Sequence, residues 1–291
     1  MRQIVLGTVQ VGLPYGRQRH SPVMTCAAAY RVLDAAWDLG VRVFDTAEAY
    51  GESAARLRSW IDARGRGSDV GVVTKFAVGS GPGESGTSER ANSALSRFDG
   101  VGNLTLLTHG AATVSEWEAV VAVASDRGCV AGQSVYSGHE VASACALPGT
   151  GRVQAPGNVL DTRAIAARGD APVPLDVRSV FLQGVLLEKP DRAEERVPGA
   201  MRVVGEVQAA AVAIGAELAP LLVASVLRML RADDRVVLGV DDEAQLGVLS
   251  RVVDISDAMS DDFRVAVGSL AGDPEHEPIL DPRRWPMVDA G

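Results

Sequence analysis

The sequence contains few aromatic residues and few cysteines, and it lacks any long apolar run. Phe, Tyr and Trp make up 4% of its 291 residues, whereas 47% are hydrophobic. A chain of this length and hydrophobicity can bury a large core. No segment approaches the roughly 18 apolar residues of a membrane span. The apolar run at residues 3–7 is too short for a signal peptide, so we expect neither feature.

Cysteine and histidine are too scarce and too scattered to suggest a metal site. Cys26, Cys129 and Cys145 are odd in number and contain no C-x-x-C spacing. We therefore expect reduced, partly buried thiols in a cytoplasmic protein. The four histidines add no metal-ligand spacing, and we predict no bound metal.

Basic residues are too few for a protein that binds nucleic acid. The formal net charge is -9 and the isoelectric point is near 5.0. A phosphate-binding surface needs clustered Lys and Arg. Acidity alone is explained by solubility and identifies no partner.

The chain also lacks a linker or a change in composition, so we expect one domain over residues 1–291. Short apolar runs alternate with longer helical stretches, which predicts parallel strands joined by helices. The eight strand-like runs are 3–7, 41–45, 70–75, 103–108, 129–134, 152–156, 177–182 and 235–239. The expected helices are 25–39, 53–64, 88–98, 115–127, 139–146, 161–168, 201–230 (divided near Gly215 and Pro220) and 243–253. A closed barrel and an open doubly wound sheet both fit this alternation.

Two segments are expected to be loops after strands. They are the glycine-rich residues 78–88 and the charged residues 188–198. Residues 81–86 formally fit G-x-G-x-x-G, but Pro82 removes a donor and the acidic residue that should follow is missing. Ser134, Ser137, His139 and Glu140 lack the G-x-S-x-G context of a hydrolase, so a solvated loop or a helix cap is the better interpretation.

Four polar side chains lie at or just beyond predicted strand ends. Asp45, Lys75 and His109 end or follow three strands, and Tyr50 lies five residues after Asp45. A carbonyl reduced by hydride needs a proton donor. An ammonium can lower the high pKa of tyrosine, a carboxylate can hold that lysine, and histidine can orient the carbonyl. Each residue alone is more often a cap, a turn residue or a solvated side chain.

The four residues also stand in segments that resemble the aldo-keto reductase family. The segments are Val43–Gly51, Val73–Phe76, Leu107–His109 and the opening Leu6-Gly7-Thr8. The resemblance implies a (β/α)₈ TIM barrel and a nicotinamide-dependent oxidoreductase of carbonyl compounds. It implies that Tyr50 is the acid/base, Lys75 its pKa modulator, Asp45 the partner of the lysine and His109 the carbonyl-orienting group.

The resemblance further implies a cofactor site. Its expected residues are Thr8, Ser134, Gln154, Arg178, Gly239, Asp241 and Gln245. Val135 stands where the family often has Asn, and Arg178 stands near the position of an aromatic ring that stacks on nicotinamide. A guanidinium plane can stack in its place.

NADP(H) is the cofactor that the resemblance implies, but NAD(H) stays open. Asp241, Asp242 and Glu243 would repel a 2′-phosphate, although acidic residues also suit a helix start. Tyr15, Phe76 and Tyr136 are expected pocket walls, with Trp285, Arg17 and His20 as further candidates.

Two alternatives from other classes remain. A barrel can keep these four residues and perform non-redox sugar chemistry, such as epimerisation or dehydration. It can also bind the cofactor as a regulator without turnover. A small-molecule carbonyl or sugar substrate is expected, and neither the substrate nor the oligomeric state follows from the sequence.

Overall fold

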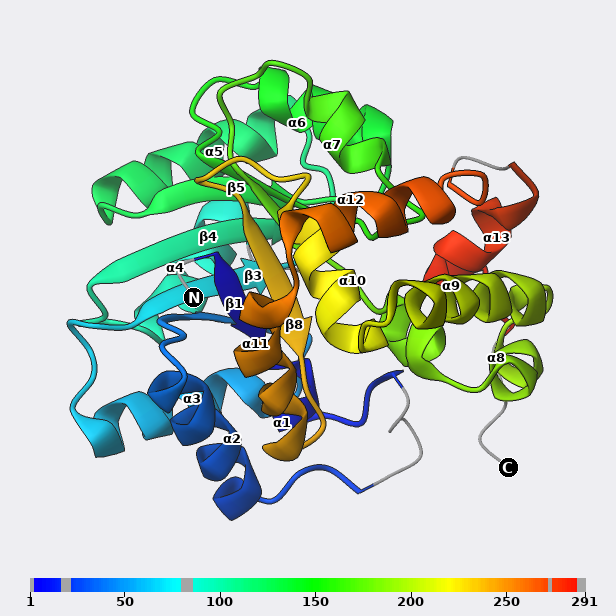
Figure 1. Cartoon of the computed structure of the whole chain (residues 1–291). Coiled ribbons are helices and arrows are strands. Elements are labelled where there is room, and N and C mark those ends of the chain that lie inside the picture. Colours follow the sequence, from blue (N-terminus) through cyan, green and yellow to red (C-terminus); the bar gives the residue numbers. More distant parts are fainter. Residues whose placement is uncertain (1–2, 17–21, 80–85, 272–273, 287–291) are drawn as a thin grey trace.

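The computed structural model describes residues 3–16, 22–79, 86–271 and 274–286 and contains a closed barrel of eight parallel strands (Figure 1). The strands pair in sequence order, and β1 also pairs with β8. The prediction of a TIM barrel is thereby confirmed, and the open sheet is excluded. The strands are β1 (Ile4–Gly7), β2 (Val43–Asp45), β3 (Gly71–Phe76), β4 (Asn103–His109), β5 (Val130–Ser134), β6 (Arg152–Pro156), β7 (Leu175–Arg178) and β8 (Arg235–Gly239).

Helices surround the barrel and cover the outward faces of its strands (Figure 1). The main helices are α2 (Cys26–Asp38), α3 (Ser53–Arg64), α4 (Thr87–Ser96), α5 (Val114–Asp126), α6 (Gly138–Ala146), α7 (Arg163–Arg168), α9 (Ala200–Ile214), α10 (Leu218–Leu227) and α12 (Asp257–Ala266). Shorter ones are α1 (Val9–Gly12), α8 (Pro190–Arg196), α11 (Gly247–Arg251), α13 (Glu277–Leu280) and the 3-10 turns η2 (Leu182–Leu187), η3 (Ala244–Leu246), η4 (Val252–Asp254), η5 (Pro274–His276) and η6 (Pro282–Arg284).

Successive side chains of a strand face opposite sides, and this alternation separates the core from the site. On β2, the Phe44 ring packs outward against Trp60 of α3, with ring centroids 5.1 Å apart. The next residue, Asp45, faces the barrel interior, where it contacts Lys75 of β3. Outward-facing apolar side chains therefore pack the helices against the barrel, while inward-facing polar side chains lie in its interior.

The predicted strands and most helices agree with the structure to within a few residues, but two segments differ. Residues 188–198 were expected to be a loop, and the structure places α8 there, with Pro190 at its first position. Residues 201–230 divide at Gly215, whose φ of 76° ends α9. Pro220 does not divide the segment, because it lies in the first turn of α10, where its missing N–H costs nothing.

In the described part of the chain, no single helix is long and apolar enough to cross a membrane. The bent pair α9 and α10 passes that test of length and composition together, with a bend of 91°.

The seventh strand ends earlier than the apolar run 177–182 suggests. It spans Leu175–Arg178, and Ser179 then adopts a φ of 67°. Leu182 and Gln183 also have positive φ values, of 50° and 52°. Among the described residues, these three are the only non-glycine residues with positive φ. Such conformations are costly and are found where the surroundings fix them, often at functional sites.

The N-terminal end of the barrel interior is filled by a charged triad. The Asp176 carboxylate accepts from Arg152 at 2.8 Å and from Arg235 at 2.6 Å. Asp176 is buried, and Arg152 also bonds the Asp233 carbonyl in the loop before β8. These long side chains occupy space that apolar residues usually fill in such barrels.

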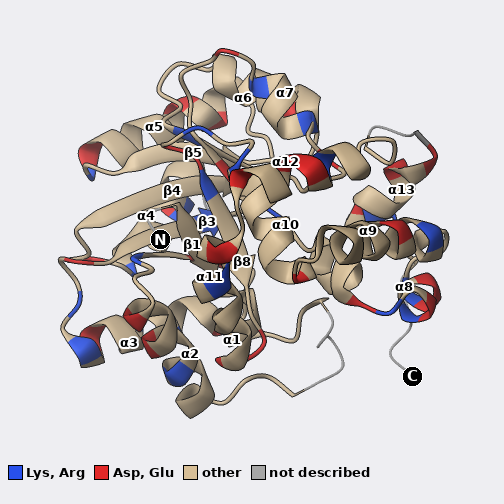
Figure 2. Cartoon of the chain, in the orientation of Figure 1, with Lys and Arg blue, Asp and Glu red and all other residues tan. Residues whose placement is uncertain are grey.

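The outer surface carries mixed charge, with Lys or Arg beside Asp or Glu on α3, α8 and α12 (Figure 2). The expected partly buried thiols are found at Cys129 and Cys145, whereas Cys26 is exposed because it begins α2.

Candidate active site

A cavity of about 660 Å³ lies at the C-terminal ends of the barrel strands. Active sites of this fold are built at that end. Residues from the ends of six strands line the cavity, together with Tyr50 from the loop after β2. The strand-end residues are Gly7, Asp45, His109, Ser134, Arg178 and Gly239.

Asp45 and Lys75 form a buried ion pair on the floor of this cavity. The Lys75 Nζ lies 2.5 Å from both carboxylate oxygens of Asp45. Gln154 donates its side-chain amide to the same carboxylate at 2.8 Å. The lysine side chain is 0% exposed, and a buried charge persists only when it is paired in this way.

Tyr50 and His109 lie above that pair and line the cavity. The Lys75 ammonium is 5.1 Å from the centroid of the Tyr50 ring. The Tyr50 and His109 rings meet edge to face, with centroids 6.2 Å apart and planes at 89°. The structure thus brings together all four residues that the sequence analysis grouped.

The environment keeps Tyr50 protonated and His109 neutral at pH 7. Burial, and then the Asp45 carboxylate, raises the pKa of Tyr50 above that of free tyrosine. Burial, followed by the charges of Lys75 and Arg178, lowers the pKa of His109. Burial also lowers the pKa of Lys75, although Asp45 favours its ammonium form. The net shift of the Tyr50 pKa is upward because burial and the Asp45 charge outweigh the lowering effect of Arg178.

The loop that carries Tyr50 is fixed by a close backbone contact. A Cβ on Gly12 of α1 would lie 2.0 Å from the Tyr50 carbonyl oxygen and 2.2 Å from the Ser53 nitrogen. Gly51 has a φ of 56°, which completes the turn into α3. Only glycine permits either feature without displacing Tyr50.

Thr8 supports this loop and does not line the cavity. Its hydroxyl donates to the Asp45 carbonyl at 2.8 Å and lies 2.6 Å from the Ser53 hydroxyl. Ser53 in turn contacts the Thr46 hydroxyl at 2.9 Å. Its buried side chain holds β1 against the start of α3, and the contact of Thr8 with a cofactor stays a prediction.

Ser134 and Gln154 lie side by side, but only Ser134 lines the cavity. The Ser134 hydroxyl donates to the Gln154 side-chain oxygen at 3.2 Å. Because the Gln154 amide also donates to Asp45, both of its ends are occupied. These bonds give Gln154 a role in positioning Asp45, and its contact with a cofactor amide stays a prediction.

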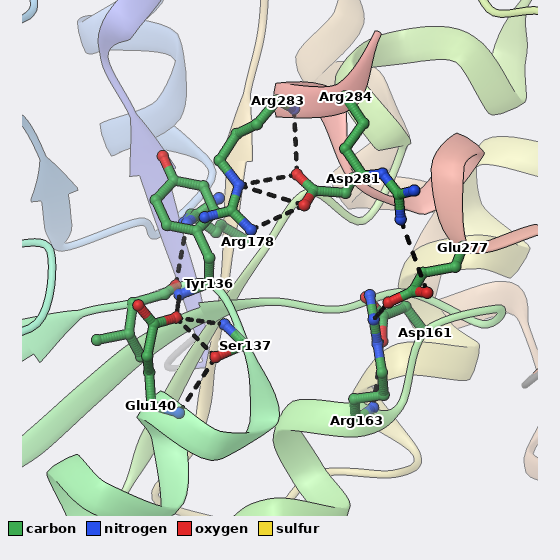
Figure 3. A network of polar contacts seen from close by, with 11 residues as sticks. Tyr136, Ser137, Glu140, Asp161, Arg163, Arg178, Glu277, Asp281, Arg283 and Arg284 are labelled. Carbon is green, nitrogen blue, oxygen red and sulfur yellow. Dashed lines mark hydrogen bonds and ion pairs between the residues drawn. The ribbon is translucent and has the colours of Figure 1, made fainter. Parts of the chain in front are cut away.

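Arg178 projects from the end of β7 into the cavity wall. Its Nη2 donates to the Val135 carbonyl at 3.1 Å, and its guanidinium lies 4.4 Å from the Tyr136 ring centroid. Arg283 of η6 lies 4.2 Å from the centroid of the same ring and pairs with Asp281 (Figure 3). The Val135 side chain is buried in the core, so only its backbone carbonyl reaches this cluster.

Glycines and one orphaned amide form the β1 and β8 side of the cavity. Gly7 and Gly239 are paired neighbours, and a Cβ on Gly239 would meet the Gln10 amide at 2.6 Å. The Gln10 side-chain oxygen is buried and has no hydrogen-bond partner among the described residues. Because glycine has no side chain, a ligand can approach the backbone closely at Gly7 and Gly239. The unpaired Gln10 oxygen beside them suits a ligand with hydroxyl or amine donors, such as the ribose or amide of a nucleotide.

The segment after β8 gives this end of the cavity a negative character. Asp241 accepts from the Gln245 side chain at 3.2 Å, and Asp242 accepts from the Gln245 backbone nitrogen at 3.0 Å. Both aspartates and Gln245 line the cavity, as does Arg251 of α11. Arg251 pairs with Glu217 at 2.6 Å, so its charge is largely compensated.

The sequence of this site matches a known family. Residues 3–99 match the profile of the Aldo/keto reductase family. This match covers about a third of the chain and agrees with the predicted resemblance. The matched residues include Asp45, Tyr50 and Lys75, whereas His109 lies beyond them.

Solved aldo-keto reductase structures share the fold at low sequence identity. A glycerol dehydrogenase from Gluconobacter oxydans has 15% identity and a TM-score of 0.70, over 96% of this chain and 94% of that chain. An aldo-keto reductase from Bacillus halodurans has 15% identity and a TM-score of 0.64, over 92% of each chain. One from Brucella melitensis has 14% identity and a TM-score of 0.64, over 91% and 93%. No curated protein matches the sequence.

The expected pocket walls are found in part. Tyr15 and Tyr136 line the cavity, and burial raises the pKa of Tyr15. Phe76 is a correction: it follows the inward Lys75 on β3, so it faces outward and packs in a second core cluster with Leu95 and Trp117. Trp285 is also outside the cavity, where its indole donates to the Ile279 carbonyl at 2.9 Å. Arg17 and His20 lie outside the described residues.

Sequence reasoning missed several cavity residues. Gln10 lies in α1, three residues after the end of β1, and its position near a strand end could have identified it. Phe181 follows β7 but was assigned to the strand itself, and Gln183, just beyond the predicted strand, was given no role. Ser137 and Glu140 form a capping box at the start of α6, which confirms the cap interpretation over a hydrolase (Figure 3).

Proposed function

We propose that this protein is a nicotinamide-dependent oxidoreductase that acts on the carbonyl group of an aldehyde, ketone or sugar. The observation that carries the proposal is the position of Tyr50 and His109 in the cavity, above the buried Asp45–Lys75 pair. The cavity thus contains a protonated acid, Tyr50, beside a neutral imidazole, His109, that can donate a hydrogen bond. The family match over residues 3–99 supports the same activity.

When bound in the cavity, a reduced nicotinamide would supply the hydride, with its two electrons, that the carbonyl carbon receives. Tyr50 donates its phenolic proton to the carbonyl oxygen as the π bond breaks, so that a C–H and an O–H bond form. The raised pKa of Tyr50 suits a group that must hold a proton until transfer. In the opposite direction, the Tyr50 phenolate would accept the proton of an alcohol.

His109 orients the carbonyl oxygen toward Tyr50. Its neutral ring can donate one hydrogen bond without adding a positive charge that would compete for the proton. Lys75 and Asp45 act from behind the ring of Tyr50, where the ammonium is positioned to stabilise a developing phenolate. Gln154 keeps Asp45 in place for this purpose.

Cofactor binding is assigned to the β5, β7 and β8 sides of the cavity. Ser134 and Gln10 would meet the nicotinamide and its ribose, and Gly239 would allow the backbone to approach. The segment Asp241–Gln245 would meet the adenosine. The predicted NADP(H) is less favoured than NAD(H) here, because Asp241 and Asp242 face the cavity and Arg251 is paired with Glu217.

The decisive experiment combines binding and turnover. The purified protein is titrated with NADH and NADPH by fluorescence, and the oxidation of each is followed with a panel of aldehydes, ketones and sugars. Tyr50→Phe should retain cofactor affinity and lower kcat by about 10²- to 10⁴-fold. Tyr30→Phe is the matched control, because Tyr30 lies on α2 away from the cavity.

The two alternative functions predict other outcomes. Lack of affinity for both nucleotides would overturn the redox proposal and favour non-redox sugar chemistry. Cofactor binding without turnover of any carbonyl would favour a regulator.

A further inference from the structure

Arg178 is a cation at the reacting end of the cavity whose charge is not balanced by an acidic partner. In the described part of the chain, no carboxylate pairs with its guanidinium, which contacts the Val135 carbonyl and the Tyr136 ring. The other basic groups of the cavity are compensated: Arg251 pairs with Glu217, and Lys75 pairs with Asp45. A half-buried guanidinium with free N–H groups favours an anionic ligand.

The position of Arg178 places that ligand beside the carbonyl. Arg178 lines the same cavity as Tyr50, Tyr15 and His109. Its positive charge also lowers the pKa values of these three side chains, which agrees with that proximity. Tyr50 and His109 define where the carbonyl oxygen would be held. An anionic group near Arg178 would therefore be attached close to that carbonyl.

The guanidinium is held in one orientation. The Tyr136 ring lies against it, and Arg283 contacts the same ring from the C-terminal segment (Figure 3). The Tyr136 backbone nitrogen donates to Glu140 of the α6 capping box at 3.1 Å. A guanidinium held in one orientation can donate two parallel hydrogen bonds to two oxygens of one carboxylate or phosphate. It recognises such a group better than the flexible ammonium of a lysine does.

Charged groups of both signs line the cavity. Arg178 ends β7, whereas Asp241 and Asp242 follow β8. An anionic substrate would be attracted to Arg178 and repelled by the two aspartates, which favours one orientation.

We propose that Arg178 selects substrates that carry an anionic group, a carboxylate or a phosphate, next to the carbonyl that is reduced. This proposal rests on the proposed oxidoreductase activity and assigns its substrate class. The reduction is the one described above: the hydride goes to the carbonyl carbon and the Tyr50 proton to its oxygen, while the anionic group is unchanged.

The test compares three substrates that differ beside one ketone. They are pyruvate, with a carboxylate, dihydroxyacetone phosphate, with a phosphate, and the neutral hydroxyacetone. We expect kcat/KM to be at least about tenfold higher for one of the anions than for hydroxyacetone. The better anion identifies the group. Equal kcat/KM values for all three would overturn the proposal while leaving the oxidoreductase activity intact, whereas failure to reduce any carbonyl would overturn that activity.

Variants separate a substrate contact from a cofactor contact. Arg178→Gln should lower kcat/KM for the preferred anion by about 10- to 100-fold and change that for hydroxyacetone little. Arg178→Lys should recover part of the loss, because the charge returns without the fork. Arg283→Gln is the matched control, since Arg283 touches the same Tyr136 ring but pairs with Asp281.

Affinity for the reduced cofactor gives a readout without turnover. If Arg178→Gln weakens binding of NADH or NADPH as strongly as it lowers kcat/KM for the anion, Arg178 belongs to the cofactor site and the proposal is wrong. Binding of oxamate, an unreactive carboxylate, to the cofactor-loaded protein should be lost in Arg178→Gln and kept in Arg283→Gln.

Discussion

The Lys75 ammonium lies 2.5 Å from each carboxylate oxygen of Asp45, at the floor of the cavity and away from solvent. Each charge is therefore the main compensation for the other. Removing one partner would leave the other buried and unpaired.

We expect Lys75→Met to lower the free energy of unfolding by about 3–5 kcal/mol, because the Asp45 carboxylate would lose its counter-charge. The double variant Asp45→Asn/Lys75→Met should recover most of that loss. Urea denaturation measures both. Lys189 is the other lysine of the sequence and is exposed, so Lys189→Met is the control. A loss for Lys75→Met no larger than that of the control would contradict the buried pair.

His109 should make stability depend on pH below about 6.5. Its folded pKa is lowered by burial, Lys75 and Arg178, so the unfolded chain binds a proton more readily. Stability is unaffected above the unfolded pKa of about 6.5 and falls as the pH drops from there through the folded pKa. The free energy of unfolding, measured from pH 7.5 to 5, should fall less for His109→Gln. His139→Gln, at an exposed position, should keep the full slope.

Gly12→Ala should damage both stability and turnover. Its Cβ would lie 2.0 Å from the Tyr50 carbonyl oxygen, so the loop that carries Tyr50 must move. Overpacking of this kind costs about 1–3 kcal/mol or more, and a displaced acid lowers kcat. Gly86→Ala is the control, because no atom lies within 4 Å of its added Cβ. Thermal denaturation and steady-state kinetics test both effects, and wild-type kcat in Gly12→Ala would refute the positioning argument.

The acidic end of the cavity should set the choice of nucleotide. In Asp241→Asn/Asp242→Asn, two negative charges near the expected 2′-phosphate are removed while side-chain shape is kept. We expect the ratio of Kd values, NADPH to NADH, to fall about tenfold. Glu243→Gln is the comparison, since Glu243 pairs with Arg31 at 3.2 Å and does not line the cavity. An unchanged ratio would show that other groups choose the cofactor.

The fold was largely predictable because each barrel strand is a short apolar run and each helix has apolar residues at helical spacing along one face. Asp45, Lys75 and His109 were predictable for a related reason, since strand ends of a parallel barrel converge on one mouth. The same rule of alternation also shows why Phe76 is not in the pocket. With Lys75 facing inward, its neighbour must face the helices.

Other features depend on contacts between distant segments. The run Val177–Leu182 looks like a strand, but β7 ends at Arg178 because Ser179 adopts a left-handed conformation that no residue preference announces. Gln154 was expected to face the cofactor, and only the folded chain shows its amide already held by Ser134 and Asp45. The α8 helix was predicted to be a loop because the segment is rich in charged residues. Pro190 at its first position is typical of a helix start and could have indicated the helix.

The triad of Arg152, Asp176 and Arg235 closes the end of the barrel opposite the cavity. Each of its hydrogen bonds is directed to a fixed partner, so this end offers no easy route for solvent toward Tyr50. In the proposed reaction, Tyr50 gives up one proton in every cycle and must recover it before the next. That proton would have to arrive through the mouth, past the bound substrate or after its product departs. Reprotonation of Tyr50 and release of the product would then take place through the same opening of the cavity. The two steps would therefore be linked in time.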